Sequence, residues 1–256
     1  EIEAAAKNRL PQLIERKDLK GDLHIHTAAS DGHNSLEEMV RAAKQQGLKY
    51  IAVTEHSGRL KVAGGLDSKR LRQQIDEIDR LNDRLKGFYI LKGLEVEILK
   101  DGSLDLSDAE LSQLDLVVGT VHSHFNLSLD KQTERILRAM DQPYFSMLAH
   151  PTGRKLNQRE PYQVDLTRII QKAGERGCFL ELNANPKRLD LTDIYCQMAK
   201  EQGVLVSINS DAHSIDAYND LEFGIGQARR GWLEKKDVLN TRSLTQVRKL
   251  LKKTMG

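Results

Sequence analysis

Histidine and carboxylate side chains recur at the ends of short apolar runs along this 256-residue chain. Six of the eight histidines lie there, together with two carboxylates: His24, His26, His56, Glu95, His122, His150, Asp211 and His213. Imidazole and carboxylate together favour Zn, Mn or Fe over Ca or Mg alone. Six imidazoles and two carboxylates exceed what one ion can use, so the pattern predicts a site of two or three metals if these residues converge.

The local spacing supports convergence. His24 and His26 are two residues apart, so a strand would place both imidazoles on one side, with Leu23 and Ile25 on the other. A single strand histidine is more often a hydrogen-bonded structural residue than a ligand, and only the joint pattern favours the metal site.

Three other polar residues are expected to be non-ligands. Glu97 follows Glu95 by two residues and could be a second ligand, but we expect a solvated charge beyond the strand end. His33 lies in the loop sequence SDGHN, and His124 follows His122 in VHSHF. Both histidines are interpreted as lying outside the metal site.

Strand-like and helix-like segments alternate along the chain. Runs rich in β-branched residues predict strands at residues 21–27, 50–56, 89–98, 114–122, 145–151, 178–185 and 205–213. Segments with a period near 3.6 predict helices at 36–46, 68–86, 130–140, 164–175, 192–202 and 244–253. Ser35 and Glu38 have the spacing of a capping box. The glycine-containing stretch 224–231 is expected to be irregular.

The order of these segments predicts the fold. Strands that alternate with helices pair in parallel through right-handed crossovers. Seven such units favour a distorted seven-stranded βα barrel of the TIM type, and an open doubly wound sheet is the alternative. In a barrel the C-terminal strand ends form one face, so the histidines and carboxylates would meet there. No linker divides residues 21–256, which are expected to form one domain.

The amino-acid composition limits which binding partners and which cellular compartment are expected for this protein. Lys and Arg number 39 against 37 Asp and Glu, a balance that argues against a polybasic membrane anchor or a highly charged nucleic-acid-binding tail. No apolar run approaches the roughly 18 residues of a membrane span. Cys178 and Cys196 form no CxxC pair and indicate no disulfide framework. These features favour a cytoplasmic protein without a membrane partner.

Several longer motifs resemble a known family. HIHTAASDG (24–32), TEHS (54–57), GLEVEI (93–98), VHS (121–123), AHPTGR (149–154) and NSDAH (209–213) resemble, in this order, the polymerase and histidinol phosphatase (PHP) domain. DGSLDLSD (101–108), HPTGRKLNQREPY (150–162), LELNANPKRLDL (180–191) and GQARRGWLEKKDVLNT (226–241) are similar to the C-terminal PHP domain of bacterial family X DNA polymerases. Residues 1–20 resemble the connector after a polymerase module, which leaves 21–256 as the PHP metallohydrolase domain.

The resemblance implies a trinuclear metal site in a distorted seven-stranded barrel. It assigns His24, His26, Glu95 and Asp211 to one ion, Glu95 with His122 and His150 to a second, and Asp31, His56 and His213 to a third. Asp31 comes from the resemblance alone. Mn and Zn suit these donors, and Fe is also compatible.

The same resemblance implies a metal-dependent 3′→5′ exonuclease that processes single-stranded or gapped DNA 3′ ends in repair, with abasic-site nuclease activity also attributed to the family. Glu95, His122 and Asp211 are the expected catalytic residues. Arg154 is the candidate phosphate-binding residue, because a guanidinium matches phosphate bidentately. A surface ion pair of Arg154 with Glu160 or Asp165 is an equally good interpretation.

Two alternatives remain open. A small-molecule phosphatase of the histidinol phosphate phosphatase type would use the same metals on a monoester. A non-catalytic domain that supports a polymerase would have lost ligands, whereas this chain retains a candidate at every position named above.

Overall fold

Seven parallel strands form the centre of the protein in a computed structural model that describes residues 2–256. In chain order they are β1 (Gly21–Ile25), β2 (Tyr50–Val53), β3 (Tyr89–Glu97), β4 (Leu116–Thr120), β5 (Met147–Leu148), β6 (Phe179–Asn183) and β7 (Val206–Asn209). Each strand pairs with the next, and a parallel bridge between Ile25 and Ala212 joins β1 to the end of β7. The sheet is therefore a nearly closed barrel, as the order of segments predicts, and the open doubly wound alternative is wrong.

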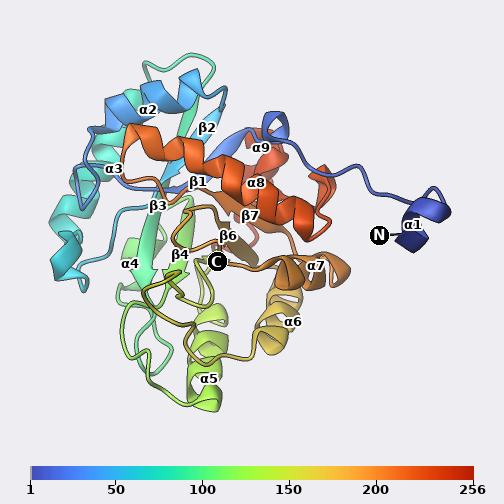
Figure 1. The fold of residues 1–256 in the computed structure, drawn as a ribbon. Coiled ribbons are helices and arrows are strands. Elements are labelled where there is room, and N and C mark those ends of the chain that lie inside the picture. Colours follow the sequence, from blue (N-terminus) through green and yellow to red (C-terminus); the bar gives the residue numbers. More distant parts are fainter. Residues whose placement is uncertain (1) are drawn as a thin grey trace.

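Helices cover the outside of the barrel (Figure 1). They are α1 (Ile2–Ala6), α2 (Leu36–Gln45), α3 (Ser68–Asn82), α4 (Asp108–Leu111), α5 (Leu129–Met140), α6 (Leu166–Arg176), α7 (Asp193–Glu201), α8 (Leu221–Arg230) and α9 (Leu244–Leu251). The six predicted helices correspond to α2, α3, α5, α6, α7 and α9 within a few residues. The predicted capping box opens α2, where the backbone N–H of Ser35 donates to Glu38 Oε2 at 2.8 Å.

The expectation of an irregular stretch at 224–231 is wrong, because most of it forms α8. Gly224 explains the difference. A Cβ atom at this position would lie 2.7 Å from side-chain carbons of both Ala184 and Ile208. The glycine lets α8 approach the sheet closely, and it is a packing residue although glycine disfavours helices.

Two apolar layers hold the barrel together. The inner layer includes Ala52, Leu91, Val118 and Met147, and Val247 of α9 belongs to the same buried cluster. The outer layer fills the space between the strands and the surrounding helices. Because burying one such side chain contributes roughly 1.5–3 kcal/mol, these layers supply the main stabilisation.

Strand β1 departs from simple alternation. Its register against β2 shifts between Asp22 and Ile25, which marks a bulge or irregularity. Leu23 belongs to the inner apolar cluster, whereas Ile25 belongs to the outer one. The expectation that Leu23 and Ile25 share one side is therefore wrong, and the irregularity allows Leu23 to fill the barrel below His24.

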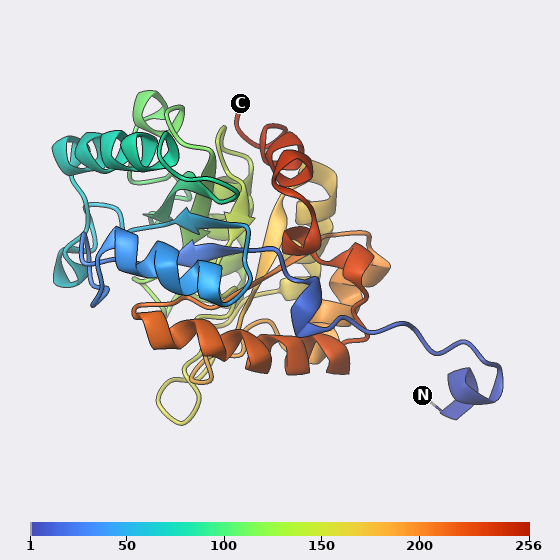
Figure 2. The same cartoon turned by 90° about the horizontal axis from the view of Figure 1, so that it is seen from above.

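The N-terminal helix α1 lies apart from the barrel (Figure 2), and none of its residues is buried. The segment that follows does pack on the barrel, because Ile14 is fully buried and its N–H donates to Leu233 O at 3.0 Å. Cys178 and Cys196 are both free and buried. Among residues 2–256, no helix has the length and apolar character to cross a membrane.

Candidate metal centre

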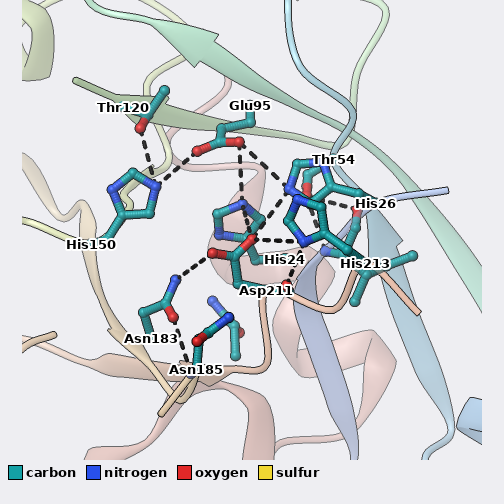
Figure 3. Close-up of polar contacts among 12 residues, drawn as sticks. His24, His26, Thr54, Glu95, Thr120, His150, Asn183, Asn185, Asp211 and His213 are labelled. Atoms are coloured by element: carbon teal, nitrogen blue, oxygen red, sulfur yellow. Dashed lines mark hydrogen bonds and ion pairs between the residues drawn. The ribbon is translucent and has the colours of Figure 1, made fainter. Parts of the chain in front are cut away.

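Glu95, on the inner face of β3, lies among imidazoles that four other strand ends supply. Figure 3 shows Glu95 beside His24, His26 and His150. Its Oε2 lies 2.9 Å from Nδ1 of His56 and 3.5 Å from Nε2 of both His24 and His26. Glu95 is buried, and so are these three histidines. Burial raises the pKa of Glu95, but the charges of His56, His24 and His122 outweigh it and hold the pKa well below its usual range.

The other oxygen of Glu95 faces a second pair of imidazoles. Oε1 lies 3.0 Å from Nε2 of His150 and 3.6 Å from Nε2 of His122. Thr120 Oγ1 also lies 3.4 Å from His150 Nε2. One carboxylate thus faces five imidazoles through its two oxygens, which is the arrangement of a bridging ligand between metal ions.

Asp211 and Asp31 complete the cluster on either side of His26. Asp211 Oδ1 lies 3.3 Å from His26 Nε2 and 3.6 Å from His24 Nε2. Asp31 approaches Nε2 of His56 at 3.3 Å and Nε2 of His213 at 3.4 Å. Burial raises the pKa of Asp31, but hydrogen bonds from His213 and His56 outweigh it, so the carboxyl stays ionised.

The nine predicted residues therefore lie together, and three groups among them have donor atoms within 4.8 Å of one another. These groups are His26, Asp31, His56 and His213; His24, His26 and Asp211; and His56, Glu95 and His122. His150 lies outside the three groups and contacts Glu95. His26 and His56 each belong to two groups, so the groups overlap, and any one of them could hold a divalent ion.

The chemistry of the buried donors fits metal ions. His24 Nε2, both ring nitrogens of His26, His56 Nδ1 and Glu95 Oε2 are buried and have no hydrogen-bond partner within residues 2–256. Leaving such a group unsatisfied costs about 1–3 kcal/mol, so several at one point indicate cation ligands. Burial lowers the pKa of His26 and of His150 to about 4, which keeps both in the neutral form that binds metals. At His24 and His56 burial also lowers the pKa, but neighbouring carboxylates outweigh it and raise the pKa of both, so a metal ion bound there would displace a proton.

Glu181 on β6 orients the cluster and was not predicted. Its Oε1 lies 2.7 Å from His24 Nδ1, and its Oε2 accepts the N–H of His150 at 2.8 Å. Asn209 Nδ2 also donates to Glu181 at 2.9 Å. An ionisable residue inside the apolar run CFLELNAN, on the one predicted strand without a candidate, was the available signal.

Glu97 is not the solvated charge that the sequence favoured. It is buried and accepts the N–H of His122 at 3.0 Å and the Oγ–H of Ser123 at 2.6 Å. Its Oε2 also lies 3.3 Å from Nδ1 of His122. The buried Arg135 of α5 approaches Glu97 at 3.5 Å and neutralises it. Glu97 therefore orients His122 through Nδ1, which leaves Nε2 facing Glu95.

His33 and His124 lie outside the three groups. The N–H of His33 donates to His213 O at 2.7 Å, and this backbone contact connects the loop around His33 to the segment after β7. His124 is exposed.

Arg154 is anchored to backbone. Its Nε donates to Arg188 O at 2.8 Å, and its Nη2 donates to Leu189 O. The structure shows no ion pair of Arg154 with Glu160 or Asp165, and its phosphate-binding role stays a prediction. Arg188 approaches the metal cluster itself, with Nε 3.5 Å from Asp211 Oδ2.

A cavity of about 320 Å³, here called the metal cavity, opens over the cluster. Its lining residues include the candidate ligands His122, Asp211 and Asp31 and the basic residues Lys155 and Arg188. Candidate metal ligands and basic side chains thus line the same cavity.

Comparisons with known proteins show the family of this chain. The model of the PHP domain matches residues 22–185. The DNA polymerase/3′-5′ exonuclease PolX of Bacillus subtilis (strain 168) is 45% identical over 242 residues, which are 94% of this chain and 42% of that protein. This chain therefore corresponds to less than half the length of that relative.

One further relative and one solved structure carry names of phosphatases. A protein named "Probable phosphatase" from Thermoanaerobacter sp. (strain X514) is 29% identical over 86% of this chain and 89% of its own length. The crystal structure of histidinol phosphate phosphatase from Lactococcus lactis, complexed with Zn, L-histidinol and phosphate, has a TM-score of 0.58 and 17% identity, covering 83% of this chain and 93% of that one. The likeness to that structure shows a shared fold. The match over residues 22–185 and the barrel identify this chain as a member of the PHP domain family of phosphoesterases.

Proposed function

We propose that this chain hydrolyses phosphodiester bonds at DNA 3′ ends, as a 3′→5′ exonuclease that uses two or three divalent ions. The observation that carries the proposal is the position of Glu95, whose two oxygens face five imidazoles at 2.9–3.6 Å. The name of the 45% identical relative, an exonuclease, supports DNA as the substrate. Mn and Zn suit the mixed imidazole and carboxylate donors, and Fe is also compatible.

Three residues carry the central roles. Glu95 would hold ions through both of its oxygens, His122 would contribute to one of these sites, and Asp211, which approaches both His24 and His26, would contribute to another. Bound divalent ions would activate water near neutral pH and neutralise charge that builds on the phosphate. Glu181 and Glu97 hold His24 and His122 in fixed orientations through their second ring nitrogens.

The substrate phosphate has basic side chains available in the metal cavity. Arg188 lines it together with Lys155 and Lys187. The buried Nη1 of Arg188 has no hydrogen-bond partner within residues 2–256. Because a guanidinium binds phosphate through paired N–H groups, Arg188 is the proposed phosphate-binding residue. Arg154, the candidate from sequence, would then position Arg188 by binding its carbonyl.

The proposed setting is cytoplasmic DNA repair beside a polymerase module. The relative PolX is named as both polymerase and exonuclease, and this chain matches 42% of its length. Single-stranded or gapped 3′ ends are the proposed partner, with abasic sites as a further substrate.

The experiment is a cleavage assay on 5′-labelled single-stranded and gapped DNA with Mn, Zn or Mg. We expect stepwise shortening from the 3′ end and release of deoxynucleoside 5′-monophosphates. Loss of this activity in Glu95→Gln, with normal activity in the exposed-site variant Glu175→Gln on α6, would assign it to the cluster. Intact DNA under all three metals would overturn the proposal.

The second candidate is a small-molecule phosphatase. The relative named "Probable phosphatase" matches 86% of this chain over nearly its own full length, which favours retention of monoester chemistry. Release of orthophosphate from L-histidinol phosphate with DNA left intact would support this candidate.

A further inference from the structure

A second and larger cavity opens beside the metal cavity. It has a volume of about 740 Å³ and is here called the side cavity. His122 and Leu60 line both cavities, so the side cavity begins directly at the metal cluster. Its volume lies within the range of about 300–1,000 Å³ that is typical of small-molecule sites.

The lining of the side cavity combines apolar, cationic and acidic groups, and of the two carboxylates Glu97 is paired with Arg135 while Asp101 is exposed. Leu60 and Leu99 are half-buried and supply aliphatic surface. His124 adds an exposed imidazole, and Arg59 and Lys100 place two basic side chains at the rim. An aliphatic and imidazole surface suits the flat face of a nucleobase, and a basic rim suits a flanking phosphate.

The side cavity has a rigid frame. Arg135 donates from Nε to Leu99 O at 2.9 Å and from Nη1 to Ser123 O at 2.8 Å. It also donates to Ile98 O and approaches Glu97. One buried guanidinium thus ties together the loop after β3 and the loop after β4, which carry Leu99 and His124. The two loops hold their spacing before any ligand arrives, which lowers the entropic cost of binding.

We propose that the side cavity binds the nucleoside next to the scissile phosphate, with the base against Leu99 and His124. The inference rests on the proposed function and names a further binding site for its substrate. A phosphate held in the metal cavity would place its nucleoside beside His122, at the opening that the two cavities share. A substrate without a base would not occupy the side cavity, which would then contain only water.

The test compares two phosphodiesters with the same leaving group, thymidine 5′-(p-nitrophenyl phosphate) and methyl p-nitrophenyl phosphate. The ratio of their kcat/KM values isolates the contribution of the nucleoside. We expect the wild-type chain to prefer the thymidine compound, and His124→Ala and Leu99→Ala each to lower the ratio by about tenfold, as expected for loss of one base contact.

Two controls accompany the comparison. Lys249→Ala on α9, at the opposite end of the barrel, should keep the wild-type ratio. His124 is exposed, so its replacement tests the site even if Leu99→Ala lowers the melting temperature. An unchanged ratio in both variants, with DNA still cleaved, would overturn the nucleoside site alone. Failure of the wild-type chain to cleave DNA or either diester would instead overturn the proposed function.

Discussion

The carboxylate of Glu181 lies 2.7 Å from Nδ1 of His24, and both side chains are fully buried. This contact leaves Nε2 of His24 as the free nitrogen facing Glu95 and Asp211. The same carboxylate also accepts the N–H of His150. Glu181, which is not a candidate ligand, therefore fixes the orientation of one candidate ligand and the backbone of another.

Replacing Glu181 with Gln should weaken metal binding by about 10–100-fold, because partners of this kind raise the basicity of the ligand they hold. Competition against a chromophoric chelator measures the change. Glu175→Gln, an exposed change on α6, is the matched control. Equal metal affinities in both variants would contradict the role of Glu181.

Replacing Glu95 with Gln should reduce hydrolysis by at least about 100-fold, since a neutral amide cannot bridge two cations as a carboxylate does. Steady-state kinetics at saturating Mn would measure the loss. Activity within tenfold of wild type would show that Glu95 does not bridge.

Replacing Arg135 with Leu should lower the free energy of unfolding by about 3–5 kcal/mol, because the buried Glu97 would lose its positive partner. Urea denaturation measures the difference. Arg138, one turn further along α5, is exposed, and Arg138→Leu should change stability by less than about 0.5 kcal/mol. A similar loss in both variants would show that the network is not responsible.

Asp190 should make stability depend on pH. Burial raises its pKa to about 6, although Thr152 donates to it through N–H and Oγ–H. Because the folded pKa exceeds the unfolded value of about 3.9, the folded state binds this proton more tightly, and that stabilisation is lost as pH rises through the folded pKa. Asp190→Asn cannot ionise, so it should gain up to about 3 kcal/mol over wild type between about pH 4 and about pH 7.

Urea unfolding of both proteins across this range measures the gain, and the exposed Asp76→Asn provides the control. A constant difference between Asp190→Asn and wild type at all pH values would contradict the prediction.

Much of the fold could be predicted because the periodicity of apolar residues indicates which side chains are buried. The order of strands and helices specified a parallel barrel, and the barrel placed the predicted residues at one end. Two features escaped this reasoning. The irregular register of β1 leaves no mark in an alternating pattern, and α8 contains Gly224 because of its distance to Ala184 and Ile208.

At the site, residue type and strand position were enough to single out six histidines with Glu95 and Asp211, whereas the roles of Glu97 and Glu181 were not predicted. Glu97 looks like a surface charge until Arg135, from a distant helix, neutralises it. Glu181 contacts His24, which is more than a hundred positions away in the sequence. It also contacts His150, which follows the neighbouring strand β5. The run CFLELNAN marks Glu181 as an ionisable residue on a strand, but which residues it contacts depends on the folded geometry.

The most direct test of the metal centre is elemental analysis of the purified chain by inductively coupled plasma mass spectrometry, after loading with Mn or Zn and removal of free metal. Wild type is predicted to retain two or three ions per chain and Glu95→Gln at least one fewer. Less than one ion in wild type, or equal contents in the two proteins, would contradict a centre bridged by Glu95.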